Sequence, residues 1–322
     1  MSLSFLTPAA ALVGLAVVPA VAALVAAQRR SRRACAVLGL VPRAPLAVVP
    51  DIAALTLVGA FTAAAAAQPV ATRSTPVESR ADAEAIIVLD VSRSMLARTP
   101  GKATRLARAQ DAAKTLRTEL PEVPLGVGSL TDRVLQHLFP SPSENAFAAT
   151  IERALGIMRP PPERGVQGSG TSFAALSAVA SQNFFGKNAR RRVLFVLTDG
   201  ESRPFAIAPV RRALARAHVI PLFVRLWNSD ERVYGANGTP EPLYRPEPST
   251  PKRLARIAHA LGGRVFGESE IADAAGAARE ALGEGPTVIR GEELTSRILS
   301  PFAMAAGFLC LLFVVWRRNF AR

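Results

Sequence analysis

The segment 85–95, AIIVLDVSRSM, places one carboxylate and two hydroxyls directly after an uninterrupted apolar run. Asp90 follows five apolar residues, and Ser92 and Ser94 come next at every second position. This pattern is compatible with a serine nucleophile, a phosphate-binding loop or part of a metal site. The other polar motifs of the chain distinguish among these three.

Two later motifs supply further oxygen atoms. VLFVLTDGES brings an apolar run to Asp199, and QGSGTSFAALSAV puts Thr171 after a glycine-rich turn, where a helix is predicted to start. If both apolar runs are parallel strands, their carboxyl ends lie at one edge of a sheet. Two carboxylates and three hydroxyls would meet there, and Mg²⁺ prefers such hard oxygen ligands. We expect the two acids to be unpaired at this edge and to repel each other without a cation.

The rival chemistries lack their partner residues. A serine nucleophile needs a histidine within reach, but His137, His218 and His259 all fall outside these motifs. The chain has no G-x-S-x-G elbow. GVGSL lacks the lysine and the G-K-[ST] ending of a phosphate-binding loop. The metal interpretation is therefore favoured, and no catalytic set is predicted.

The elements that must position these residues alternate along the chain. Apolar runs at 85–89, 193–197 and 219–224 are typical of parallel strands buried on both faces. Between and after them, apolar residues recur every three or four positions, as in amphipathic helices, over 106–120, 207–217 and 254–261. The runs 124–130 and 134–139 are too close for a crossover helix, so they predict an antiparallel hairpin. The predicted fold is α/β: a doubly wound, mostly parallel, Rossmann-like sheet with one antiparallel edge hairpin, flanked by three transmembrane helices. Such sheets bind ligands beyond the carboxyl ends of their strands.

The three motifs together resemble the von Willebrand factor A (VWA) domain with its metal-ion-dependent adhesion site. DVSRS, GSGTS and LTDGE match the family pattern in order, within a domain predicted over 82–285. The resemblance implies Mg²⁺ or Mn²⁺ as cofactor and these metal ligands: Asp90, Ser92, Ser94, Thr171 and Asp199. It also implies that an Asp or Glu of a protein partner completes the coordination. Arg93 stands where many relatives have Gly, which places a cation beside the site.

More narrowly, the chain resembles the membrane-anchored VWA proteins of the bacterial aerotolerance (Bat) group. Those proteins have two N-terminal spans, a VWA domain and a C-terminal span. LARIAHALGGRVF, residues 254–266, resembles the last helix and strand of that group. The resemblance implies other VWA proteins and a MoxR-type AAA+ ATPase as partners, the ATPase acting from the cytoplasmic side.

The segment 227–250 is predicted to leave the same edge of the sheet as the metal site. It contains Trp227 and both tyrosines of the chain, Tyr234 and Tyr244. Because long loops with aromatic residues are often recognition surfaces, these three residues and Arg93 are the predicted partner-binding set. The alternative is a proline-rich solvated loop.

Three long apolar stretches predict transmembrane helices within 1–28, 44–70 and 298–316, since about 20 residues cross a hydrocarbon core of about 30 Å. Arginines occupy the loop 29–43 and the tail 317–322, which are therefore predicted to be cytoplasmic. The chain is then a multi-pass protein of the cell membrane with 82–285 outside the cytoplasm. A cleaved signal peptide is the alternative for the first stretch, but the basic start is missing. Asp51 is expected to cap the second span at its N-terminus.

Charge and cysteine content narrow the function further. About half of the net charge of +14 comes from the termini and membrane flanks, and the remaining arginines are scattered, so nucleic-acid binding is not predicted. Cys35 and Cys310 both lie outside 82–285, which excludes a disulfide within that domain.

The predicted function is a membrane-tethered, metal-dependent protein-binding module, a scaffold or chaperone-like component for envelope protein assembly. A metal-dependent adhesin or sensor for an external ligand is the alternative, and an enzyme is not predicted.

Overall fold

Contacts within the chain divide it into two units, Met1–Thr75 with Leu294–Arg322, and Pro76–Glu293. We call the first the helical unit and the second the sheet unit. The computed structural model describes residues 2–40, 48–159, 161–163, 170–235, 237–242 and 244–320.

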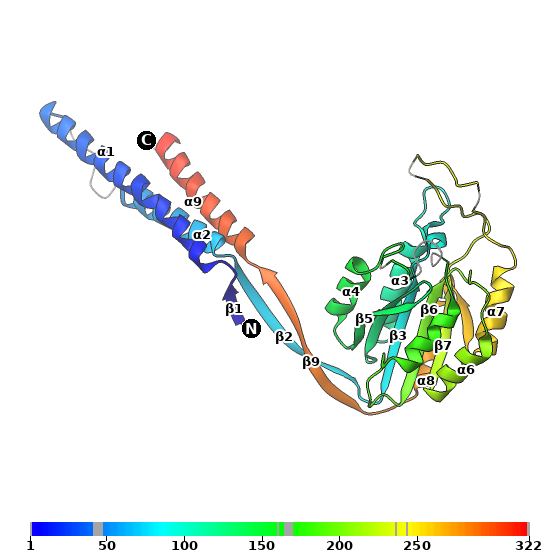
Figure 1. Ribbon diagram of the computed structural model, residues 1–322. Helices are drawn as coiled ribbons and strands as arrows, with labels where there is room; N and C mark the ends of the chain where they lie inside the picture. The colour runs from blue at the N-terminus through cyan, green and yellow to red at the C-terminus, as the bar shows by residue number, and fades with distance from the viewer. Residues whose placement is uncertain are drawn as a thin grey trace. The chain divides into compact units, whose positions relative to one another are not determined.

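The sheet unit is built on six strands in the order β5-β4-β3-β6-β7-β8 (Figure 1). The strands are β3 Ala83–Asp90, β4 Leu125–Leu130, β5 Val134–Ser141, β6 Arg191–Thr198, β7 Val219–Arg225 and β8 Arg264–Gly267. β5 runs antiparallel to β4, and the other neighbouring pairs are parallel. The predicted doubly wound sheet with one antiparallel edge hairpin is therefore confirmed.

Helices cover both faces of this sheet, which explains why its central strands are continuous apolar runs (Figure 1). One face packs against α3 Arg105–Glu119, α4 Glu144–Arg153 and α8 Ile271–Leu282. The other packs against η5 Phe173–Leu176, α5 Ser177–Ser181, α6 Ile207–Arg216 and α7 Thr250–Ala260. Successive side chains of β3 alternate between the two cores, Ile87 and Leu89 in the first and Ile86 and Val88 in the second. All eight β3 residues are buried as a result.

The segment 254–266 forms a helix followed by a strand, but these two elements do not end the sheet unit. α7 and β8 do form there, but α8 follows and packs into the first core through Ala274 and Ala278. Its buried face consists mainly of alanine, which gives only a weak apolar period in the sequence.

The path of the chain brings two strand ends together at the centre of the sheet. From β3 the chain goes to β4 and β5 on one side, and it later returns to β6 on the other side. β3 and β6 are parallel neighbours, with Leu89 opposite Leu197. Their carboxyl ends therefore flank the point at which the strand order reverses, where doubly wound sheets bind ligands.

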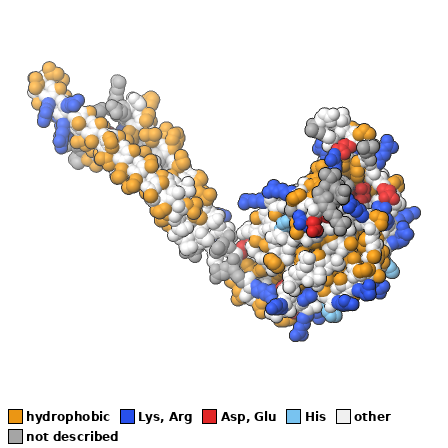
Figure 2. Space-filling view, in the orientation of Figure 1, with side chains coloured by type: hydrophobic (Ala, Val, Ile, Leu, Met, Phe, Trp, Pro, Cys, Tyr) orange, Lys and Arg blue, Asp and Glu red, His pale blue; other side chains and the backbone are white. Residues whose placement is uncertain are grey.

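The helical unit contains η1 Pro8–Ala16, α1 Val17–Val37, α2 Val49–Ala66 and α9 Ser300–Phe320. The strands β1 Ser2–Phe5, β2 Pro69–Arg80 and β9 Thr287–Ile298 form a second sheet in the order β1-β2-β9. Among the described residues, three helical stretches are long and apolar enough to cross a membrane: Pro8–Val37, Val49–Ala66 and Ser300–Arg317. Figure 2 shows hydrophobic side chains covering much of the visible surface of these helices. The start of the predicted second span, 44–47, lies outside the described residues.

Asp51 does not cap the second predicted span. α2 begins at Val49 with Val48 as its N-cap residue, so Asp51 lies inside the first turn and makes no capping hydrogen bond. Its carboxylate instead pairs with Arg317 of α9, Nε to Oδ1 at 3.1 Å. The prediction was wrong because the helix begins earlier than we expected. An acid in the first turn still interacts favourably with the helix dipole.

The second core depends on Phe173, two residues after Thr171. Its ring is fully buried and makes edge contacts with Phe205 and Phe223, at centroid distances of 6.2 and 5.7 Å. Phe173→Ala should lower the free energy of unfolding by about 3–5 kcal/mol because it opens a cavity in a packed core. The measurement is urea unfolding followed by Trp227 fluorescence in a Trp316→Phe background. Phe139, whose side chain is exposed, provides the control: Phe139→Ala should change little, and equal losses in both variants would contradict this assignment.

Candidate metal centre

Asp90, the last residue of β3, lies fully buried at the centre of a cluster of hydroxyls. Its Oδ1 accepts a hydrogen bond from the Ser92 amide at 3.0 Å. The Thr171 hydroxyl lies 2.9 Å from both carboxylate oxygens, and the Thr198 hydroxyl donates to Oδ2 at 2.7 Å. The carboxylate is therefore held in one orientation by donors from three separate segments.

Ser92 and Ser94 are presented by the turn that follows β3. The 3₁₀ helix η3, Arg93–Leu96, begins after Ser92 and is anchored by the fully buried side chain of Met95. The two serine hydroxyl oxygens lie 3.1 Å apart. With Thr171 they line a pocket of about 610 Å³ at this edge of the sheet.

Thr171 is held by backbone contacts with two neighbouring loops. The Ser172 amide donates to the Thr131 carbonyl between β4 and β5 at 2.9 Å, and the Arg203 amide donates to the Thr171 carbonyl at 2.9 Å. The first helical turn, η5, begins at Phe173, as the sequence predicted. Residues 165–169 of the predicted glycine-rich turn lie outside the described residues.

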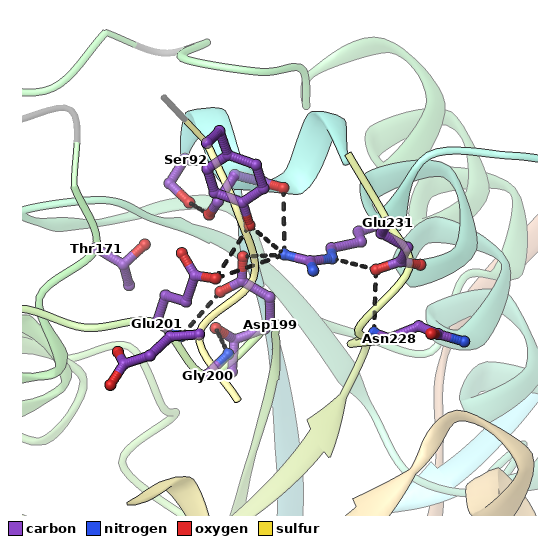
Figure 3. A network of polar contacts seen from close by, with 12 residues as sticks. Ser92, Thr171, Asp199, Gly200, Glu201, Asn228 and Glu231 are labelled. Carbon is purple, nitrogen blue, oxygen red and sulfur yellow. Dashed lines mark hydrogen bonds and ion pairs between the residues drawn. The ribbon is translucent and has the colours of Figure 1, made fainter. Parts of the chain in front are cut away.

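Asp199 follows β6 directly and is fully buried, but it is not unpaired. Its Oδ1 accepts from the Glu201 amide at 2.9 Å, and its Oδ2 pairs with Nη1 of Arg105 at 2.8 Å (Figure 3). The expectation of two unpaired acids that repel each other is therefore wrong for Asp199, because α3 supplies a buried cation beside it.

Arg105 is the residue of this site that sequence reasoning missed. It lies on the buried side of α3 with Ala109, Ala112 and Leu116, a spacing of four, three and four residues. An arginine on the apolar stripe of an amphipathic helix is a signal of a buried charge, since such charges are rarely buried without a partner. The local sequence does not show that the partner is Asp199.

Burial shifts the ionisation of the acids in this cluster. Burial and then the Asp199 carboxylate raise the pKa of Asp90 to about 7, although hydrogen bonds from Ser92 and Thr198 oppose the shift. The same two causes raise the pKa of Glu201 to about 7, against the hydrogen bond from Tyr244 and the charge of Arg105. A divalent cation bound here would oppose both shifts, because it favours the charged form of each acid.

The residues that this edge brings together fit a hard divalent cation. Three hydroxyl-bearing residues, Ser92, Ser94 and Thr171, line the pocket, and the buried carboxylates of Asp90 and Asp199 lie at the ends of β3 and β6. All five offer oxygen, as Mg²⁺ or Mn²⁺ requires. Within the described part of the chain, no group of three or more His, Cys, Asp or Glu residues could hold a metal ion. A metal at this site would therefore depend on the hydroxyls.

The residues predicted to bind a partner occupy different places. Arg93 and Tyr244 line the pocket, and Arg93 forms an ion pair with Glu241 while its side chain remains 63% exposed. Tyr234 lies elsewhere in the segment, with the Arg98 guanidinium 5.4 Å from its ring centroid. Trp227 is partly buried and is not among the described residues that line the pocket.

Comparison with known proteins supports the resemblance drawn from the motifs. Residues 85–201 match the family model of the von Willebrand factor type A domain, a range that includes Asp90, Thr171 and Asp199. No curated protein matches the chain by sequence.

Several solved structures resemble the chain. An aerotolerance-related membrane protein from Bacteroides fragilis is 17% identical, with a TM-score of 0.49, over 62% of this chain and 98% of that one. The conserved hypothetical protein BatB from Bacteroides thetaiotaomicron is 18% identical, with a TM-score of 0.46, over 62% and 99%. Proximal thread matrix protein 1 from the mussel byssus, with a zinc-occupied MIDAS motif, is 14% identical, with a TM-score of 0.39, over 63% and 48%.

The two buried acids should differ in their contribution to stability. Asp199→Ala removes one partner of a buried ion pair and should lower the free energy of unfolding by about 3 kcal/mol or more. Asp90→Asn should change it by about 1 kcal/mol or less, because its oxygen can still accept from the Ser92 amide and the hydroxyls can reorient. Hydrogen exchange of the β3 and β6 amides in EDTA measures both changes. A loss of about 1 kcal/mol or less in Asp199→Ala would show that the pair with Arg105 contributes little to stability.

Proposed function

We propose that the sheet unit is a metal-dependent protein-binding module in which Asp90, Ser92, Ser94, Thr171 and Asp199 hold Mg²⁺ or Mn²⁺. The observation that carries this proposal is the placement of three hydroxyl-bearing residues around one pocket, with two buried carboxylates at the adjoining strand ends. The VWA match over the same residues supports it.

The bound cation would supply a positive charge that attracts an anionic oxygen, such as the carboxylate of an Asp or Glu on a partner protein. The protein's own residues prepare the site for this. Asp90 is fixed by three donating groups, and Asp199 shares its charge with Arg105. Because Arg105 already balances part of the negative charge of Asp199, Asp199 would neutralise less of the charge of the metal ion. The metal would then bind a carboxylate of the partner more strongly.

Of the four residues predicted to bind a partner, Arg93 and Tyr244 are the two that line the pocket beside the site of the cation. Arg93 already pairs with Glu241, so a partner carboxylate would have to compete with that acid. A charge in such an exposed position mainly affects the association rate and its salt dependence. Trp227 and Tyr234 remain candidates for contacts farther from the metal.

We further propose that the protein is anchored in the cell membrane by three spans within 1–28, 44–70 and 298–316. The basic segments 29–43 and 317–322, whose residues 29–37 and 317–320 continue α1 and α9, would be cytoplasmic, with the domain 82–285 outside the cytoplasm. The three apolar helices and the concentration of arginine in 29–43 and 317–322 support this arrangement.

Anchored in this way, the module would be a scaffold for envelope protein assembly, working with other VWA proteins. A MoxR-type AAA+ ATPase would contact the cytoplasmic loop or tail.

Partner binding should require both the metal and the hydroxyl of Thr171. Affinity capture of envelope proteins on the purified protein should recover specific partners with Mg²⁺ and lose them at least tenfold in EDTA or with Thr171→Ala. Thr115→Ala, which removes an exposed hydroxyl on α3, is the matched control. Recovery of the same proteins by the Thr171 variant in EDTA would mean that the metal does not take part in binding.

The proposed topology predicts a labelling pattern for cysteines. A membrane-impermeant thiol reagent should label Ser249→Cys in intact cells because residue 249 is exposed on the sheet unit. Native Cys35 should react only after the membrane is permeabilised. The opposite pattern would reverse the proposed orientation.

A further inference from the structure

The guanidinium of Arg105 pairs or hydrogen-bonds with Asp199, Glu231 and Tyr244, which belong to two separate segments. Asp199 and Glu231 are labelled in Figure 3. Its Nη1 pairs with Asp199 at 2.8 Å, and its Nε pairs with Glu231 at 2.6 Å. The same Nη1 donates to the Tyr244 hydroxyl at 2.7 Å. Asp199 belongs to the metal centre, whereas Glu231 and Tyr244 belong to the segment 227–250. The charge is fully buried, so these contacts hold it in the interior.

Glu231 fixes the beginning of the segment to this cation. Its side chain is 2% exposed, and it accepts from the Asn228 amide at 3.1 Å and from Nη2 of Arg108 at 2.6 Å. Arg108 and Arg105 both hold the Glu231 carboxylate. Among the described residues, Arg108 has no contact with Asp199. Arg108 thus holds the segment only, whereas Arg105 also connects it to Asp199 of the proposed metal site.

Tyr244 closes a ring of hydrogen bonds at the wall of the pocket. Its hydroxyl accepts from Arg105 and donates to Oε1 of Glu201 at 3.0 Å. The Glu201 amide in turn donates to Asp199. Arg105 also lies 3.9 Å from the Glu201 carboxylate. The group that orients Asp199 thus also positions a side chain that lines the pocket.

We propose that Arg105 is a positioning residue that couples metal binding at Asp199 to the stability of residues 228–235 and to the position of Tyr244 in the pocket wall. The inference rests on the proposed metal site. A divalent cation that attracts Asp199 weakens its attraction for Arg105, which then interacts more strongly with Glu231, Tyr244 and Glu201. Metal binding should therefore stabilise the segment, and by linkage a stabilised segment should strengthen metal binding by the same factor.

The test combines calorimetry of Mg²⁺ binding with hydrogen exchange of the full-length protein in detergent. In the unmodified protein, Mg²⁺ should slow exchange at least threefold at residues 228–235 and 244–247. Tyr244→Phe, which keeps the ring, should lose the response at 244–247, keep it at 228–235, and weaken Mg²⁺ binding about fivefold. Arg108→Gln should speed exchange of 228–235 with and without Mg²⁺ but keep the ratio between the two.

Arg105→Lys keeps the positive charge, but a lysine cannot reach all three partners. This variant should bind Mg²⁺ without any slowing of hydrogen exchange at residues 228–235 and 244–247. If that variant does not fold, Tyr244→Phe and Arg108→Gln still decide the question. No Mg²⁺ heat in the unmodified protein would refute the proposed metal site itself. Mg²⁺ heat with unchanged exchange in the segment, or a Tyr244→Phe response equal to that of the unmodified protein, would refute only the coupling.

Discussion

The ion pair between Arg105 and Asp199 is the interaction on which the arrangement of the proposed metal centre depends. Both side chains are fully buried at the edge of the sheet. Removing charges from water is costly, and a buried pair is tolerated only when geometry and additional hydrogen bonds compensate for that cost. Here Glu231 and Tyr244 complete the surroundings of the guanidinium. The guanidinium therefore links α3 to Asp199 and also to Glu231 and Tyr244 of the segment 227–250.

The two acids of the site are stabilised in different ways. Asp90 is surrounded by neutral donors from Ser92, Thr171 and Thr198, and burial raises its pKa to about 7. Asp199 has a cation as its neighbour. The site thus contains one carboxylate whose charge is not balanced by the protein and one whose charge is. In the proposed metal site, the Asp90 carboxylate would attract a divalent cation, and the pairing of Asp199 with Arg105 would limit how much of the charge of that cation is neutralised.

Local sequence patterns predicted most of the sheet unit, but they did not predict the second sheet of β1, β2 and β9. Continuous apolar runs predicted β3, β6 and β7, and helical periods predicted α3, α6 and α7. The spacing of the polar residues after two of the strands predicted which side chains meet, because the carboxyl ends of parallel strands share one edge. α8 was missed because its alanines bury little surface each, and Asp51 was misplaced because the first residue of a helix is poorly defined by periodicity.

The sequence by itself determined the central strands and the helices between them, the motifs that converge at the switch point, and the apolar stretches of the helical unit. Only the tertiary structure decided that both acids are buried, that Arg105 compensates one of them, and that Tyr244, unlike Trp227 and Tyr234, lines the pocket. The reason is separation along the chain. Arg105 lies 94 residues from Asp199, 126 from Glu231 and 139 from Tyr244. Periodicity reports on neighbours within a few residues, whereas contacts at such separations exist only after the sheet and its helices have packed.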